Sequence, residues 1–162
     1  MKTLLLLRHA KSSWDDPSLA DHDRPLNKRG QRDAPRMGEV LREENLLPDL
    51  VLSSDALRAS QTIELVMEAS DYQSEIRFSR DLYAAGPLAC LEALAGIEDD
   101  YSCVMLVGHN PGLEELLALL CGQNESLPTA ALAQLRLPIE QWSDLKNKTR
   151  GELVEIWRPK EI

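Results

Sequence analysis

The residues of this chain best suited to chemistry are two histidines and two arginines, each placed just after an apolar run. Arg8 and His9 end the first run, Arg58 follows the second, and His109 follows a third. An imidazole can act as a nucleophile, and a guanidinium can bind two oxygens of a phosphoryl group at once. A cation beside a histidine lowers its pKa, so we expect His9 to be neutral and nucleophilic at neutral pH. These residue types therefore indicate a site for a phosphoryl group.

The apolar runs are predicted to be strands of one α/β sheet. Ligands of open α/β sheets bind beyond the carboxyl ends of the strands, so the residues that follow the runs would meet at that edge. Arg58 would also lie in the first turn of a helix, where free N–H groups favour an anion. The predicted strands are 4–7, 49–52, 75–78, 103–107, 129–137 and 152–157, and the last of these is predicted as either an internal or an edge strand.

Capping residues predict where the helices of this sheet begin. A proline inside the first predicted helix, Pro35, conflicts with an unbroken helix from Lys28, so we expect a kink or a late start there. Another helix is predicted over 88–97. The predicted caps are Asn27, then Ser53, Ser54 or Asp55, and then Asn110 before Pro111 at a first helical position.

Composition narrows the class of protein. The 162 residues predict a single domain over 1–162, and a net charge of -9 disfavours binding to nucleic acid or an anionic membrane. Arg8 interrupts the first apolar run too early for a targeting segment, so we expect a cytoplasmic protein, as a monomer. Cys90, Cys103 and Cys121 lack metal-ligand spacing, and we expect the last two to be buried.

Each candidate residue also has a structural interpretation. Arg58 can be a solvated surface arginine, His9 a structural histidine, and His109 part of a turn. For His22, in the polar loop predicted over 12–25, the sequence favours the interpretation of a solvated loop residue.

The combination of these residues resembles the histidine phosphatase superfamily, also called phosphoglycerate mutase-like. The resemblance covers about Leu4 to Leu137 and implies a three-layer α/β/α fold with a mostly parallel central sheet, as a single histidine phosphatase domain. It also implies phosphoryl transfer without metal or cofactor. The superfamily motifs are Arg8-His9, Ser53-Ser54 to Arg58 with Gln61-Thr62, and Gly108-His109. Three further stretches are similar to the SixA-type phosphohistidine phosphatases, namely Arg8 to Ser12, Arg24-Pro25-Leu26 and Arg29-Gly30.

By this resemblance, His9 is the nucleophile that forms a covalent phosphohistidine, and three residues hold the phosphoryl group. Those three are Arg8, Arg58 and His109. Substrate-binding residues are expected at Lys11, Asp21, Arg24 and Asn110, of which Asp21 and Arg24 match positions near the pocket in the SixA-type branch.

Two departures from the superfamily pattern affect the predicted activity. Ala10 stands where the commonest motif has glycine, which is tolerable if the backbone angles suit alanine. Leu82-Tyr83-Ala84 lacks the glutamate that serves as proton donor in mutases and many sugar-phosphate phosphatases. An imidazole whose other nitrogen is protonated leaves as a neutral group and needs little proton donation, so a phosphohistidine substrate is favoured. Asp21 or Asp23 remains a possible proton donor.

The leading hypothesis is therefore a metal-independent phosphohistidine phosphatase that acts on a phosphohistidine-containing protein or a small phosphorylated substrate. Two alternatives are a phosphatase of small phosphate esters on the same scaffold and a non-catalytic phosphate- or phosphoprotein-binding module. A metal enzyme is disfavoured because the arginines beside His9 and His109 would repel a cation.

Overall fold

The computed structural model describes residues 1–162 and contains six strands and four α-helices. Four short 3-10 helices, at residues 21–23, 80–82, 142–144 and 159–161, lie in the connections. The elements in chain order are β1 (Lys2–Arg8), α1 (Lys28–Glu43), β2 (Leu50–Ser54), α2 (Leu57–Ser70), β3 (Glu75–Ser79), α3 (Pro87–Ala95), β4 (Cys103–Gly108), α4 (Gly112–Cys121), β5 (Leu132–Leu137) and β6 (Glu152–Trp157).

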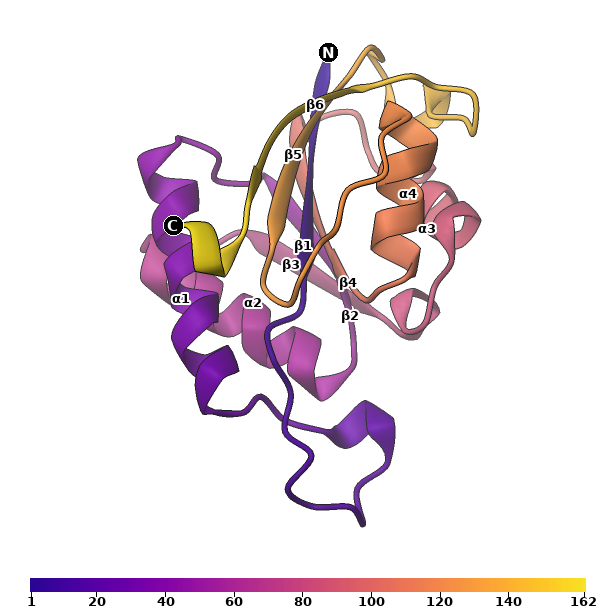
Figure 1. Cartoon of the computed structure of the whole chain (residues 1–162). Helices are drawn as coiled ribbons and strands as arrows, with labels where there is room; N and C mark the ends of the chain where they lie inside the picture. Colours follow the sequence, from indigo (N-terminus) through magenta and orange to yellow (C-terminus); the bar gives the residue numbers. More distant parts are fainter.

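The strands form one mixed sheet in the order β3-β2-β4-β1-β5-β6. Neighbours among the first four strands are parallel, whereas β5 pairs antiparallel with both β1 and β6. Helices α1 and α2 cover one face, and α3 and α4 cover the other (Figure 1). The predicted α/β fold with a mostly parallel sheet is confirmed, and β6 is an edge strand.

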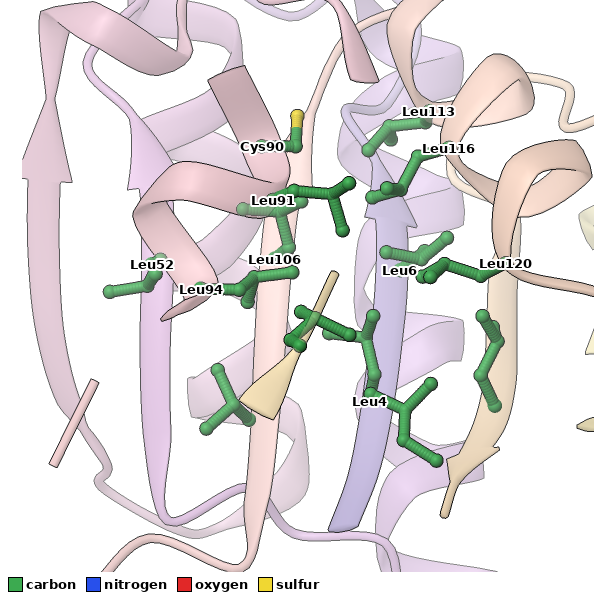
Figure 2. Packing of buried hydrophobic residues seen from close by; sticks show 14 of the residues in the cluster. Leu4, Leu6, Leu52, Cys90, Leu91, Leu94, Leu106, Leu113, Leu116 and Leu120 are labelled. Atoms are coloured by element: carbon green, nitrogen blue, oxygen red, sulfur yellow. The ribbon is translucent and has the colours of Figure 1, made fainter. Parts of the chain in front are cut away.

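The first apolar run supplies side chains to both faces of the sheet because successive residues of a strand point in opposite directions. Leu4 and Leu6 pack in the cluster under α3 and α4, where Figure 2 shows them with Leu120. Leu5 and Leu7 pack in the cluster under α1 and α2. All four leucines are completely buried. This strand reads as an unbroken apolar run because it is covered on both faces.

Helix α1 begins at Lys28 and continues through Pro35, so the predicted late start is wrong. The Asn27 side chain caps it by accepting a hydrogen bond from the Gly30 N–H, as predicted. Pro35 costs one intrahelical hydrogen bond. Packing offsets this cost, since α1 buries an apolar face against α2 so closely that a Cβ on Gly38 would lie 2.3 Å from the Val66 carbonyl oxygen.

Two other predicted caps are wrong. Strand β2 extends through Ser54, and the residue that caps α2 is Ala56, without a side-chain hydrogen bond. Ser54 Oγ instead accepts from the Ala56 N–H at 3.2 Å. The residue before α4 is Pro111, so Asn110 lies one position too early to cap that helix. Ser54 belongs to β2 and Asn110 precedes Pro111, so neither residue stands at the position that caps a helix.

The prediction that Cys103 and Cys121 are buried is wrong, because both are partly exposed and Cys90 is the buried cysteine. Cys103 is the first residue of β4 and Cys121 the last of α4, where covering layers end. Burial nevertheless raises the pKa of the Cys121 thiol to about 11.

No helix of this chain combines the length and the apolar character that crossing a membrane requires.

Candidate active site

The carboxyl ends of β1, β2 and β4 bring the predicted residues together at one edge of the sheet. Arg8 pairs with Gly108 across the parallel strands, and the His9 N–H donates to the Gly108 carbonyl at 3.1 Å. His9 and His109 are therefore neighbours, with ring centroids 5.0 Å apart. His9, Arg58 and His109 are all buried, with 7%, 7% and 8% of their surface exposed.

The His9 ring is held in one tautomer. Its Nδ1 lies 2.7 Å from the Ala10 carbonyl oxygen, which can only accept, so Nδ1 carries the proton and Nε2 keeps a free lone pair. Burial lowers the pKa of His9 to about 3, and the nearby His109, Arg58 and Arg8 contribute to the lowering. His9 is thus a neutral imidazole at neutral pH, as the sequence predicts.

The backbone after His9 is fixed to helix α2 through Thr62. The Ala10 N–H donates to Thr62 Oγ1 at 2.9 Å, and the same hydroxyl donates to the Arg58 carbonyl at 2.6 Å. Ala10 is buried, and its φ is not positive, so alanine fits where the commonest superfamily motif has glycine. Thr62 is completely buried and couples the position of His9 to that of α2.

Arg58 is a buried part of the site rather than a solvated surface arginine. Its Nη1 donates to the Asp21 carbonyl at 2.7 Å and its Nη2 to Asp21 Oδ2 at 3.0 Å. Nη2 also lies 3.5 Å from His109 Nδ1. Because a guanidinium can only donate, His109 Nδ1 accepts this contact.

His109 is also neutral, because burial lowers its pKa to about 4 and Arg58 adds to the lowering. With Nδ1 accepting, the proton lies on Nε2, which donates to Ser54 Oγ at 2.8 Å. Ser54 is completely buried at the end of β2. Ser54 of β2, His109 and Arg58 therefore hold one another in position.

Asp21 lies at the mouth of the site on a short 3-10 helix, residues Asp21–Asp23. The Tyr83 hydroxyl donates to its carboxylate, and Arg58 and Arg24 donate to it as well. These hydrogen bonds hold the pKa of Asp21 far below its usual range. Asp21 is thus a carboxylate without a proton to give, and it orients Arg58.

Arg8 and Asn110 share one anchor in the loop before β5. Arg8 Nη1 and Asn110 Nδ2 both donate to the Leu127 carbonyl, at 3.0 and 2.8 Å. The Leu127 N–H in turn donates to Glu114 at the start of α4. Arg8 Nε and Asn110 Oδ1 are buried and have no hydrogen-bond partner within the chain. The Nε–H donor of Arg8 is therefore left without a partner inside the chain.

Arg24 and Lys11 differ in how they relate to this cluster. Arg24 is buried and donates to the Ser13 carbonyl, to Ser12 Oγ and to Asp21, so it ties the loop to Asp21. The Lys11 side chain is partly exposed and forms no hydrogen bond or ion pair with the site.

Two further side chains lie at the mouth of the site, and sequence reasoning missed one of them, His22. His22 is not a solvated loop residue: its side chain is 20% exposed, and its Nε2 lies 2.7 Å from Asp55 Oδ1. Tyr83 stands edge-on between His22 and His109, with ring centroids 4.8 and 5.5 Å away. These contacts depend on how two loops fold together, and no spacing in the sequence predicts that arrangement.

No group of three or more His, Cys, Asp or Glu side chains is arranged to hold a metal ion.

The fold and the site define a class of protein with paired arginines and histidines at the carboxyl edge of a mostly parallel α/β sheet. Residues 4–83 match the model of the histidine phosphatase superfamily, branch 1. An uncharacterized chloroplastic protein of Arabidopsis thaliana is 37% identical over 152 residues, which are 88% of this chain and 70% of that protein.

Solved structures resemble the whole chain. A candidate phosphohistidine phosphatase SixA of Agrobacterium tumefaciens is 30% identical, with a TM-score of 0.84 and 98% of each chain covered. A protein histidine phosphatase SixA complexed with tungstate, 23% identical, shares the fold with the same TM-score and coverage. The chain belongs to the histidine phosphatase superfamily, branch 1, and its scaffold is SixA-like.

Proposed function

We propose that this chain, as one domain over residues 1–162, is a metal-independent phosphohistidine phosphatase that works through a covalent phosphohistidine on His9. The observation that carries the proposal is the state of His9. Its Nδ1 donates to the Ala10 carbonyl, so the lone pair of Nε2 is free in a buried site beside two arginines. A neutral imidazole with a fixed tautomer is ready to attack phosphorus.

The proposed reaction has two displacements. The Nε2 lone pair of His9 forms a bond to phosphorus while the phosphorus–nitrogen bond of the substrate breaks and its electron pair returns to the substrate imidazole. Water then attacks phosphorus, and the electron pair of the second phosphorus–nitrogen bond returns to His9. The water oxygen and its two protons leave with the phosphoryl group as dihydrogen phosphate, and His9 is again neutral with its proton on Nδ1. Arg8 and Arg58 balance the negative charge of the phosphoryl oxygens in both steps, because phosphoryl transfer depends chiefly on positioning and charge stabilisation.

The electrostatics of the site favour a leaving group that needs no strong acid. Asp21 is held as a carboxylate by its three hydrogen-bond donors. His109 is neutral and donates its one proton to Ser54. An alkoxide leaving group would need a proton from a general acid, whereas an imidazole protonated on its other nitrogen leaves as a neutral group. This supports phosphohistidine over a small phosphate ester as the substrate.

The test is a comparison of substrates with a chelator present. We expect a phosphohistidine peptide to be hydrolysed much faster than an alkyl phosphate, and His9→Ala to abolish both activities. A faster alkyl phosphate reaction would favour the small-ester phosphatase instead. Phosphate binding without turnover of either substrate would favour a non-catalytic binding module. Full activity of His9→Ala, or activity that disappears with the chelator, would refute the proposed mechanism.

A further inference from the structure

The segment between β1 and α1 carries the most exposed large hydrophobic side chain of the chain. Trp14 is 72% exposed, whereas Trp142 is completely buried and donates its indole N–H to the Tyr101 carbonyl. The Trp14 indole N–H forms no hydrogen bond within the chain. Burial of a tryptophan removes a large apolar area from water, so an exposed tryptophan leaves that free energy available for binding.

Trp14 is exposed but held in place. The guanidinium carbon of Arg24 lies 3.2 Å from the centroid of the Trp14 ring, so the two groups are stacked. Arg24 itself is buried, and its three hydrogen bonds to Ser12, Ser13 and Asp21 fix the guanidinium. A ring that rests on a fixed platform loses little conformational entropy when a partner covers its other face.

Arg24, on which the Trp14 ring rests, is connected to the phosphoryl site through Asp21. Arg24 donates to Asp21 Oδ1, and Arg58 donates to Asp21 Oδ2. Figure 1 shows this stretch of chain projecting beyond the edge of the sheet where the strands end in the site residues. The contacts from Arg58 through Asp21 and Arg24 therefore lead to the projecting loop, toward which a molecule larger than a single amino acid could extend from a phosphoryl group at Arg58.

The loop also has a charge pattern that selects its partner. Asp15 and Asp16 follow Trp14 directly and are exposed, and Asp23 at the base of the loop has a side chain that is 66% exposed. Leu19, between them in sequence, is also exposed. Apolar side chains beside carboxylates complement a surface that presents an apolar group ringed by lysine or arginine.

We propose that the loop from Ser13 to Ala20, with Trp14 as its anchor, is a docking surface for a protein that carries the phosphohistidine within an apolar, basic surface. This inference rests on the proposed function, because it assumes that the phosphorylated residue belongs to a protein. Trp14 would act as a specificity-determining residue that distinguishes a phosphorylated protein from free phosphohistidine.

The test compares free phosphohistidine with two 15-residue peptides that have phosphohistidine at the centre. Seven extended residues on each side reach roughly 23–25 Å. One peptide carries leucine and lysine around the phosphohistidine, and the other carries serine and glutamate. The measured quantity is kcat/KM for each peptide divided by kcat/KM for free phosphohistidine, so that any effect on the chemical step cancels.

For the intact protein we expect this ratio to be about tenfold or more for the leucine–lysine peptide and near one for the serine–glutamate peptide. Trp14→Ala should bring the first ratio close to one, and Trp14→Phe should restore part of it. Val154→Ala, which shortens an exposed side chain on edge strand β6, is the matched control and should leave the ratio unchanged.

Equal ratios for the two peptides with the intact protein would overturn the inference, and so would a Trp14→Ala ratio that stays at the level of the intact protein. Neither result touches the proposed function, which in this experiment fails if free phosphohistidine and both peptides are not hydrolysed through His9.

Discussion

Thr62→Val removes one hydroxyl and isolates the contact that fixes the backbone after His9. Thr62 Oγ1 accepts from the Ala10 N–H at 2.9 Å, and valine has nearly the same volume without the acceptor. The Ala10 N–H, in a completely buried residue, would lose its partner. An unsatisfied buried donor costs about 1–3 kcal/mol, so we expect the free energy of unfolding to fall by about 2 kcal/mol.

The lost second contact of Thr62 adds little to this cost. Its hydroxyl also donates to the Arg58 carbonyl one helical turn earlier, and such a local bond within a helix contributes almost nothing to net stability. Urea unfolding followed by tryptophan fluorescence, to which the buried Trp142 contributes, measures the change, which is interpretable if the slope with denaturant is unchanged.

Ser60→Ala is the matched control on the same helix. Ser60 is partly exposed, and its hydroxyl donates to the Leu57 carbonyl at 3.0 Å, so we expect a loss below about 0.5 kcal/mol. Thr62→Ser keeps the hydroxyl and should retain phosphohistidine hydrolysis, whereas Thr62→Val should lower kcat about tenfold because the His9 ring loses its alignment. A Thr62→Val protein with the stability and the kcat of Thr62→Ser would refute the role assigned to this hydroxyl.

Three further predictions follow from the site and its supports. The pKa of His9 falls from 6.5 to about 3 on folding, so between those pH values the unfolded chain binds more protons and stability falls as pH falls. Unfolding of His9→Gln should therefore depend less on pH than that of the intact protein between pH 7 and 5, and an equal dependence would contradict the burial of a neutral His9. Arg58→Lys cannot keep both hydrogen bonds to Asp21, and we expect kcat/KM to fall about 100-fold in steady-state assays; an unchanged value would remove Arg58 from the phosphoryl site. A Cβ on Gly30 would lie 2.2 Å from the Lys11 carbonyl oxygen, so Gly30→Ala should destabilise the fold by about 2 kcal/mol in the same urea titration. The control is Gly86→Ala, which should be near neutral because the space around Gly86 is open.

The strands could be predicted because the local pattern of apolar residues determines where a buried strand forms. Leu4–Leu7 is a continuous apolar run since both faces of β1 are covered, and the residues at its carboxyl end had to lie at the ligand edge of the sheet. The meeting of Arg8, His9, Arg58 and His109 follows from this topology alone. That part of the candidate site could therefore be predicted from residue types and their order.

The errors fall where tertiary contacts override local preference. Ser54 and Asn110 are good capping residues, but Ser54 bonds His109 and the Ala56 N–H, and Asn110 bonds the Leu127 carbonyl. His22 became a partner of Asp55 only because the loop after β1 folds back over the site. Pro35 is tolerated inside α1 because the helix is packed tightly against α2. Each outcome depends on residues distant in sequence.

The most direct test of the account is whether the phosphoryl group passes through His9. A phosphohistidine peptide labelled on phosphorus is mixed with excess protein in chelator, the reaction is quenched at short times, and the labelled residue is mapped. We predict an acid-labile label on His9 that appears before phosphate is released and is absent from His9→Ala. Release of phosphate at the full rate without label on His9 would contradict the account.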